Sequence, residues 1–348
     1  MNRRTFLKTS LAAATLAHLP APVTAADVAK QKIRIGFLGV AHSHAAGKVS
    51  VAQSSADWDL VGLCEDGVAL RDRFEKQGVR LLSQAELFGK SQVVAVESAV
   101  RDHFQHAKAA LTAGKHVHVE KPPTTSLAEF KELQALASQN KCLMQMGYMW
   151  RYHPGFAKIA EAMRAGWLGE VSSIRCSMNS LINTPAARAE LVEFRGGGMF
   201  ELGSHLIDAV VRLLGRPEKI TPTLRTHGRF NDKLADNAVA VFEYPRALAT
   251  INIDLLQPNA HAHRAFEVVG SNGTAWMQPI EPPTLQLDLA KAAGPYPAKQ
   301  HTVTLPKYQR YAPELADLAD AVRNKRALAI TPETDLLVQE CVLQACQM

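Results

Sequence analysis

Residues 33–44 read IRIGFLGVAHSH, and this stretch decides the fold. The apolar run Ile33–Leu38 predicts a buried strand, followed by the turn in which a dinucleotide-binding fold places its glycine-rich loop. Gly39 stands at the first glycine position, whereas Ala41 and His44 replace the second and third glycines. The N-terminus of the following helix can still bind an anion. Taken alone, the stretch predicts either a nucleotide site or a tight strand-to-helix turn without a ligand.

Downstream of this turn, short apolar runs alternate with helical patterns. Such alternation is typical of βαβ units and predicts a parallel sheet. A last helix and strand complete a first domain over residues 31–150. The predicted strands are Asp59–Cys64, Val93–Val96, His116–Val119 and Cys142–Met146, and the predicted helices are Phe104–Ala113 and Ser126–Gln139.

The pattern changes after residue 150, where the strands become longer. We therefore predict an α/β chain whose second domain, residues 151–348, has an open, mostly antiparallel sheet. Residues 281–311 are rich in proline and glycine and predict a loop-rich excursion. The predicted strands are Val171–Met178, Ala238–Phe242, Ala249–Leu255 and Phe266–Val269, and the predicted helices are Pro154–Ala165, Met199–Leu214, Pro313–Asn324 and Pro332–Cys346.

The first 26 residues predict an export signal. Arg3 and Arg4 precede the apolar run Leu11–Leu19, which is followed by small residues up to Ala26. The run is shorter than the roughly 20 residues that span a bilayer, and a twin-arginine pair is read by export machinery rather than by lipid. We expect cleavage near Ala26 or Asp27, a periplasmic or secreted protein, and no stable association with a membrane.

The charge balance points to no particular macromolecular partner. The formal net charge of the 348 residues is +6, and it falls to +3 once the three basic residues of the signal are removed. No basic run interleaved with aromatic residues marks a nucleic-acid surface. The length predicts two domains, and the five cysteines, which lack metal-ligand spacing, are interpreted as buried thiols.

Polar residues follow two of the predicted parallel strands, at the edge where ligands bind in such sheets. Glu65 and Asp66 come after the second strand, where a carboxylate can accept hydrogen bonds from an adenosine ribose and would repel a 2′-phosphate. This position favours NAD over NADP. Glu120 and Lys121 follow the strand His116–Val119, which places a lysine at the same ligand-binding edge.

Glu201 and His205 are four residues apart in a segment that predicts a helix. That spacing puts both side chains on one face, so the carboxylate can orient the imidazole and fix its tautomer. Hydride leaves a C–H carbon readily only as the hydroxyl group on that carbon loses a proton. A histidine base, with Lys121 to hold the developing oxyanion, is a sufficient pair for oxidation by a nicotinamide.

This ordered set of residues resembles the Gfo/Idh/MocA oxidoreductases from about Ile33 to the C-terminus. The resemblance implies an N-terminal Rossmann dinucleotide-binding domain and a C-terminal α/β domain whose open sheet faces the cofactor and often mediates oligomers. It also implies that Lys121 and His205 are catalytic, that Glu201 replaces the family's usual aspartate, and that the protein is a homo-oligomer. It rests on Glu120-Lys121-Pro122, on Ser98 with His103 and His106, on Gly147–Arg151 with Pro154, and on Glu201 with His205.

The residues and the resemblance together give a set of expected ligand contacts. Arg151, Tyr152 and His153 at the domain junction are expected to line a polar substrate cleft. His261 and His263 are interpreted as surface residues, and no metal site is expected. The residues expected to contact NAD are Gly39, Ala41, His42, Ser43, His44, Glu65, Ser98, His103, Glu120 and Lys121.

The leading hypothesis is NAD(P)-dependent oxidation of a hydroxyl group on a sugar, polyol or glycoside, with the cofactor tightly bound. A glycosidase or lyase that oxidises a sugar hydroxyl transiently and returns the hydride needs the same Lys121 and His205. A third alternative is a nucleotide-free, metal-dependent lyase or hydrolase with His42 and His44 as ligands, completed by Glu201 or His205. The fourth is a binding protein that kept the fold after losing its activity.

We predict that replacing Arg3 and Arg4 with lysine leaves the precursor in the cytoplasm, because the export receptor reads the arginine pair. Cell fractionation and N-terminal sequencing of the mature protein check this. Efficient export of the double variant, or a mature chain that still begins at Met1, would contradict the prediction.

Overall fold

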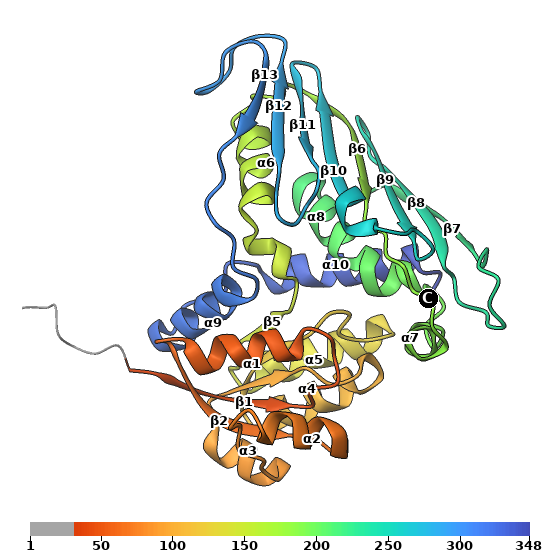
Figure 1. Cartoon of the computed structure of the whole chain (residues 1–348). Coiled ribbons are helices and arrows are strands. Elements are labelled where there is room, and N and C mark those ends of the chain that lie inside the picture. The colour runs from red at the N-terminus through yellow and green to blue at the C-terminus, as the bar shows by residue number, and fades with distance from the viewer. Residues whose placement is uncertain (1–30) are drawn as a thin grey trace, which may run out of the picture. The chain divides into compact units, whose positions relative to one another are not determined.

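Two sheets make up the described part of the chain, and both lie in the compact unit Lys32–Met348 (Figure 1). The structure is a computed structural model, and it describes residues 31–348. The export signal predicted for residues 1–26 lies outside the described residues. Among the described helices, none is long and apolar enough to cross a membrane.

The first sheet has five parallel strands in the order β2-β1-β3-β4-β5. This confirms the predicted βαβ organisation. Every residue of β3 is buried, as expected for the centre of a parallel sheet that helices cover on both faces. The strands are β1 (Ile33–Leu38), β2 (Trp58–Cys64), β3 (Val93–Val96), β4 (His116–Val119) and β5 (Met144–Met146), and the helices are α1 (Ala45–Ser54), α2 (Val68–Glu75), α3 (Gln84–Lys90), η1 (Val100–Asp102), α4 (His103–Thr112) and α5 (Leu127–Gln139).

The second sheet has eight strands in the order β13-β12-β11-β10-β6-β9-β8-β7, and its β6–β9 pair is parallel while the other pairs are antiparallel. This confirms the predicted open, mostly antiparallel sheet. Buried residues alternate with partly exposed ones along β8, so one face packs on the core. The strands are β6 (Val171–Ser177), β7 (Lys219–Arg225), β8 (Asn237–Glu243), β9 (Leu248–Asp254), β10 (Ala265–Gly270), β11 (Gly273–Met277), β12 (Leu285–Leu289) and β13 (Gln300–Val303).

Helices from the second half of the chain pack against the elements of both sheets. Helix α8 packs on β6 and β9, whereas α9 contacts α1 and β1 of the first sheet. Figure 1 shows α9 and α10, both blue, between the two sheets. The helices are η2 (Met149–Tyr152), α6 (Pro154–Arg164), α7 (Pro185–Leu191), the π-helical η3 (Met199–Gly203), α8 (Ser204–Leu214), η4 (Ala260–His263), α9 (Ala312–Asn324) and α10 (Pro332–Ala345).

Four strands of the second sheet depart from the predicted pattern. The sequence does not predict β7 or β11, and β12 and β13 lie within residues 281–311, so the loop-rich excursion predicted there is wrong in part. The edge strand β13 reads QHTV and lacks the apolar alternation by which a half-buried strand is recognised. It pairs with β12 through main-chain hydrogen bonds, which leave no trace in the side-chain pattern.

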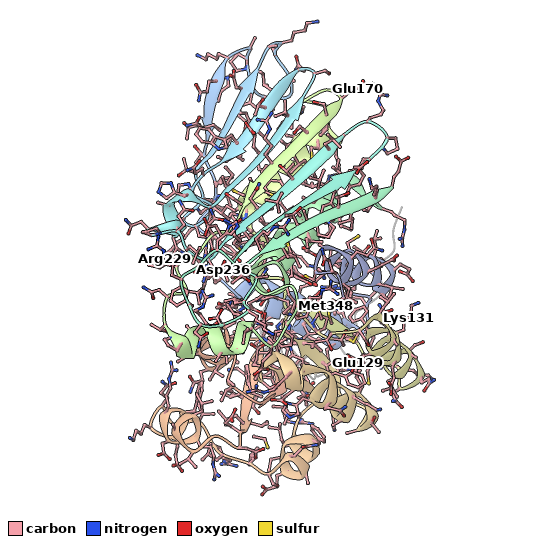
Figure 2. All side chains as sticks on the ribbon, turned by 90° about the vertical axis from the view of Figure 1, so that its right-hand side faces the viewer. Glu129, Lys131, Glu170, Arg229, Asp236 and Met348 are labelled. Atoms are coloured by element: carbon pink, nitrogen blue, oxygen red, sulfur yellow. The ribbon has the colours of Figure 1, made fainter. Side chains whose placement is uncertain are left out.

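The segment around α7 is anchored to both halves of the molecule. Arg188 of α7 forms ion pairs with Asp232 and Asp236, and Figure 2 shows Asp236 at the lower end of the second sheet. Arg101, just after β3, forms an ion pair with Glu193. All five cysteines are free thiols, three of them buried and two partly buried.

Candidate active site

Residues from both halves of the chain meet at the carboxyl edge of the parallel sheet. Glu120 and Lys121 follow β4, while Glu201 lies in η3 and His205 in the first turn of α8. The edge of a parallel sheet is where strand ends converge, which explains why this region collects polar side chains. Lys121 and His205 are each 1% exposed, so these two side chains are shielded from solvent.

Lys121 binds Glu201 across the two halves of the chain. Its Nζ donates to the Glu201 carboxylate and, at 3.0 Å, to the Glu201 backbone oxygen. His42 Nε2 lies 3.2 Å from the same carboxylate oxygen, Oε1. Burial alone would raise the pKa of Glu201, but Lys121 and His42 outweigh burial and hold that pKa well below its ordinary value. Glu201 is therefore an anion held by two partners.

The predicted pairing of Glu201 with His205 is wrong. No hydrogen bond joins them, because η3 is π-helical and residues four apart no longer share a face, and because Lys121 is a stronger partner for the carboxylate. The His205 Nδ1 atom is buried without a partner within residues 31–348. Its ring packs against Tyr148 and Trp150, with ring centroids 5.9 and 5.1 Å away. Burial and then the Lys121 charge hold the pKa of His205 well below its usual value, so the ring is neutral at physiological pH.

The turn after β1 borders a cavity of about 720 Å³ at the ends of β1, β2 and β3. Gly39 has a φ of +71°, and a Cβ there would lie 2.4 Å from Ser98 Cβ, so only glycine fits. Glu65 accepts hydrogen bonds from the Val40 and Gly67 amides, at 2.8 Å each, and supports the turn. The cavity is lined by Leu38, Gly39, Ala41, Leu63, Cys64, Glu65, Asp66, Arg71, Leu81, Leu82, Ser83, Gln84, Ser98, Ala99, Asp102 and His106.

This cavity fits the adenosine half of a dinucleotide. It lies where such folds bind one, it has a carboxylate at its ribose end, and the buried Ser98 Oγ has no partner in the described part of the chain. Ala41 and Ser43 are exposed at the turn, whereas the His42 ring points inward. His103 is unavailable to a ligand, because its two ring nitrogens contact the backbone oxygens of Pro122 and Ser98.

His42, His44 and Glu120 offer ligand atoms within 4.8 Å of one another, the spacing of a metal site. The His42 ring, however, already uses both nitrogens. Its Nδ1 accepts from the His44 amide at 3.2 Å, so the ring proton is on Nε2, which donates to Glu201. His42 therefore has no lone pair left for a cation, and this arrangement does not favour the metal-dependent alternative.

The junction residues do not line a cleft. Arg151 is buried between Asp208 and Asp335, with nitrogen–oxygen distances of 2.7 and 2.6 Å. Tyr152 Oη donates to Asp317 at 2.7 Å, and His153 Nε2 contacts the Ile280 backbone oxygen at 3.0 Å. All three side chains are thus engaged within the protein, an arrangement that does not favour the predicted contact with substrate. His261 and His263 are exposed, as the sequence analysis expects.

Beneath this centre lies a buried ionic cluster, made of Lys48, Glu97, Glu120, Glu314 and His118. The sequence predicted a role for Glu120 alone among them, as a contact to NAD, whereas its buried carboxylate binds Lys48. Lys48 Nζ contacts Glu97 Oε1 at 2.8 Å, His118 Nε2 at 2.7 Å and a Glu120 carboxylate oxygen. Glu314 of α9 approaches the same ammonium to 3.8 Å. Each side chain is at most 1% exposed. Burial raises the pKa of Glu97 and of Glu314 to about 8, while Glu120 remains ionised.

Two family models match the chain. The model described as "Oxidoreductase family, NAD-binding Rossmann fold" matches residues 33–148. The model described as "GFO/IDH/MocA C-terminal domain" matches residues 156–276. Together the two matches cover more than half of the chain and fall in the same order as the two sheets.

Known proteins resemble parts of the chain. The scyllo-inositol 2-dehydrogenase (NADP(+)) of Bacillus subtilis is 28% identical over 152 residues, 43% of this chain and 42% of the relative. The D-glucoside 3-dehydrogenase of Escherichia coli is 27% identical over 192 residues, 53% of this chain and 55% of the relative. The chain thus spans about half the length of these relatives, or less.

A solved structure shows the same fold over most of both chains. UDP-N-acetylglucosamine 3-dehydrogenase of Acidithiobacillus ferrooxidans superposes with a TM-score of 0.76 at 19% identity. The match covers 90% of this chain and 96% of that one.

We predict that Glu97→Gln flattens the pH dependence of stability. The pKa of Glu97 rises from an ordinary 4.5 to about 8 on folding, so the folded chain holds an extra proton between these values. The free energy of unfolding therefore falls as pH rises from about 5 to 8, and the variant lacks the part of this fall that Glu97 contributes, while Glu314 keeps its own part. The difference should reach roughly 2–4 °C in Tm or more, measured between pH 5 and pH 8. Glu75→Gln, at an exposed position, is the control; equal slopes in all three proteins would contradict the prediction.

Proposed function

The chain belongs to the Gfo/Idh/MocA family of oxidoreductases, and we propose that it oxidises a hydroxyl group of a sugar, polyol or glycoside with a nicotinamide dinucleotide. One observation carries this proposal: Lys121 and His205, from different halves of the chain, converge in a buried centre beside the turn after β1, which borders the cavity that fits the adenosine half of a dinucleotide. Two relatives are an inositol dehydrogenase and a glucoside dehydrogenase, which supports a sugar-like substrate.

His205 supplies the base. Its neutral imidazole can accept the substrate's hydroxyl proton, and Tyr148 and Trp150 keep water from the ring. Lys121 supplies the positive charge that holds the oxyanion as it forms. The dinucleotide, when bound, supplies the hydride acceptor. Lys121 Nζ donates to the Glu201 carboxylate and to the Glu201 backbone oxygen, which leaves its third N–H for a substrate oxygen.

We propose NAD rather than NADP. Glu65 and Asp66 both line the cavity at the end of β2, and their charges would repel a 2′-phosphate. Gly39 and Ser98 would lie against the pyrophosphate side of the nucleotide. Arg71 also lines the cavity and is the residue to which an NADP phosphate would bind, so the identity of the extracted nucleotide distinguishes the two cofactors.

We also propose that the protein is exported folded, with its nucleotide already bound, and works in the periplasm or outside the cell as a homo-oligomer. The motivation is the twin-arginine signal predicted before residue 27. Nicotinamide nucleotides are cytoplasmic metabolites, so an exported enzyme needs slow dissociation, which affinities near the nanomolar scale, about −12 kcal/mol, commonly provide.

We predict that protein purified after export carries close to one nucleotide per chain after extensive dialysis. The purified protein is denatured, and the supernatant is assayed by mass spectrometry for NAD, NADP and metals. Nucleotide at a small fraction of the protein concentration would contradict tight binding, and a stoichiometric metal without nucleotide would revive the metal-dependent alternative.

We predict that Lys121→Ala and His205→Ala each lose roughly 10² to 10⁴ in turnover, because each removes a group that acts on the reacting hydroxyl. Myo-inositol and methyl β-D-glucopyranoside serve as probes, and the reduced nucleotide is measured by absorbance. The exposed His263→Gln is the control and should keep wild-type rates. Near-normal rates in folded Lys121→Ala or His205→Ala would mean that the reacting centre lies elsewhere.

A further inference from the structure

We propose that Arg264 binds a carboxylate group of the substrate, so that the enzyme acts on an acidic sugar or glycoside. The proposal rests on the proposed function and narrows its substrate class. Arg264 directly precedes β10 of the second sheet and takes no part in the reaction as described above. Its side chain would hold the substrate at a point away from the reacting hydroxyl group.

Buried cations elsewhere in the chain are bound by carboxylates. Each of four cations with a buried side chain forms an ion pair with at least one carboxylate, and these four are Lys48, Lys121, Arg151 and Arg188. Arg264 is 7% exposed, and no ion pair formed within residues 31–348 includes it. A buried charge without a counter-charge costs free energy of folding. A bound anion can supply the missing counter-charge.

The guanidinium group of Arg264 is fixed on one side and open on the other. Its Nε donates to the Asn179 backbone oxygen at 2.9 Å. Its terminal nitrogens, Nη1 and Nη2, have no hydrogen-bond partner in the described part of the chain, and neither is fully buried. They present two parallel N–H groups, which match the two oxygens of a carboxylate. A carboxylate can therefore bind end-on without displacing a protein group.

The charges around Arg264 favour an anion with a single negative charge. Glu281 and Arg310 both act on Arg264, but they are paired with each other, with 2.6 Å between Arg310 Nε and Glu281 Oε1. The Arg264 charge lowers the pKa of His261, so this ring is mainly neutral at pH 7. Burial lowers the pKa of Arg264 itself, yet a guanidinium stays protonated in proteins. These four groups thus carry one net positive charge, which a carboxylate neutralises, whereas Glu281 would repel a phosphate dianion.

Arg264 lies on the face of the second sheet against which α8 packs, the helix that carries His205. Its backbone is extended, with φ −66° and ψ 126°, and Phe266, two residues further, is fully buried. Because alternate residues of an extended chain point to one face, Arg264 lies on the same inner face as Phe266. Ring contacts lead from there to the centre, with centroids 4.9 Å apart for Phe266 and Phe156, 5.4 Å for Phe156 and Trp150, and 5.1 Å for Trp150 and His205.

A second line of contacts connects this region with the centre through the residues before α9. Arg310 directly precedes Tyr311, and the Tyr311 ring lies 5.4 Å from the His44 ring at the turn after β1. The His44 ring in turn lies 6.0 Å from that of His205. The surroundings of Arg264 therefore border the centre from two directions, and a sugar bound at the centre can extend its carboxylate toward Arg264.

A carboxylate held in this way would position the sugar ring for reaction. Two hydrogen bonds from one guanidinium group fix both the place and the orientation of the acid group. Orientation by a remote group favours reaction because the hydroxyl group no longer has to find its base by free rotation. Arg264 is thus a specificity-determining residue that takes no part in proton or hydride transfer.

Two glycosides that differ only at C6 test this subsite. Methyl β-D-glucuronide carries a carboxylate there, and methyl β-D-glucopyranoside carries a hydroxymethyl group. Isothermal titration calorimetry of the purified protein with NAD present measures the Kd of each. We expect the wild type to bind the glucuronide more tightly by a factor of about 10 or more, and Arg264→Met to lose this preference. Arg264→Lys should keep only part of it, because an ammonium lacks the planar fork of a guanidinium. Arg229→Met, at an exposed position labelled in Figure 2, is the control and should keep the wild-type preference.

The Tm without a sugar is a second measurement. Arg264→Met replaces an unpaired buried charge by an apolar side chain, so it should keep or raise the Tm. Arg188→Met removes the partner of Asp232 and Asp236 and should lower the Tm. A fall in folded Arg264→Met as large as that in Arg188→Met would show a counter-charge within the protein and overturn the proposal. If Arg264→Met does not fold, Arg264→Gln, which keeps a donor for the Asn179 oxygen, takes its place in every measurement.

The outcomes separate this proposal from the proposed function. Equal affinity of the wild type for the two glycosides, or a preference that persists in folded Arg264→Met, overturns the carboxylate subsite, while oxidation of either glycoside leaves the oxidoreductase function standing. A preference that depends on Arg264, without oxidation of either glycoside, supports the subsite and contradicts the oxidoreductase function. A preference in Kd that is absent from kcat/KM overturns the assignment of the carboxylate to the substrate. Inorganic phosphate that displaces the glucuronide at equal concentration and ionic strength overturns the choice of a carboxylate over a phosphate.

Discussion

The buried ammonium of Lys48 is the constraint on which the rest of the site depends. A charge removed from water in this way is stable only if carboxylates compensate for the lost hydration. Glu120 does so as an anion from the end of β4, while Glu97 at the end of β3 and Glu314 of helix α9, whose pKa values burial raises to about 8, place further carboxyl oxygens near the ammonium. The Lys48 side chain of α1 therefore holds together the end of β3, the end of β4 and helix α9, which packs on the first sheet. The Glu120 carboxylate fixed in this way is also the neighbour of His44.

The two halves of the chain depend on each other at the centre. The first sheet supplies Lys121 and His44 from its carboxyl edge, while η3 and α8 supply Glu201 and His205. The proposed base, His205, and the proposed cation, Lys121, thus come from different halves of the chain.

The sequence predicts those features that short stretches of neighbouring residues determine. Runs such as Val93–Val96 predict buried parallel strands, and Lys121 stands next to a strand end, so the parallel sheet and the position of its lysine could be read directly. Lys48 could not be identified, because its partners lie 49 or more residues away and come from separate elements. The helical spacing of Glu201 and His205 predicted a pairing that the structure does not have, because a π-helical turn changes the face on which each residue lies.

In the proposed function, the Glu201 carboxylate competes with the substrate oxygen for the Lys121 ammonium. A neutral hydroxyl group is a weaker partner for an ammonium than a carboxylate is, so a bound sugar in its ground state gains little from Lys121. As the proton leaves, the oxygen becomes an anion and can displace Glu201. The lysine is then released at the moment when its charge matters, and the interaction favours the transition state over the substrate. The Glu201 carboxylate thereby makes the site stabilise the reacting substrate more than the substrate that is only bound.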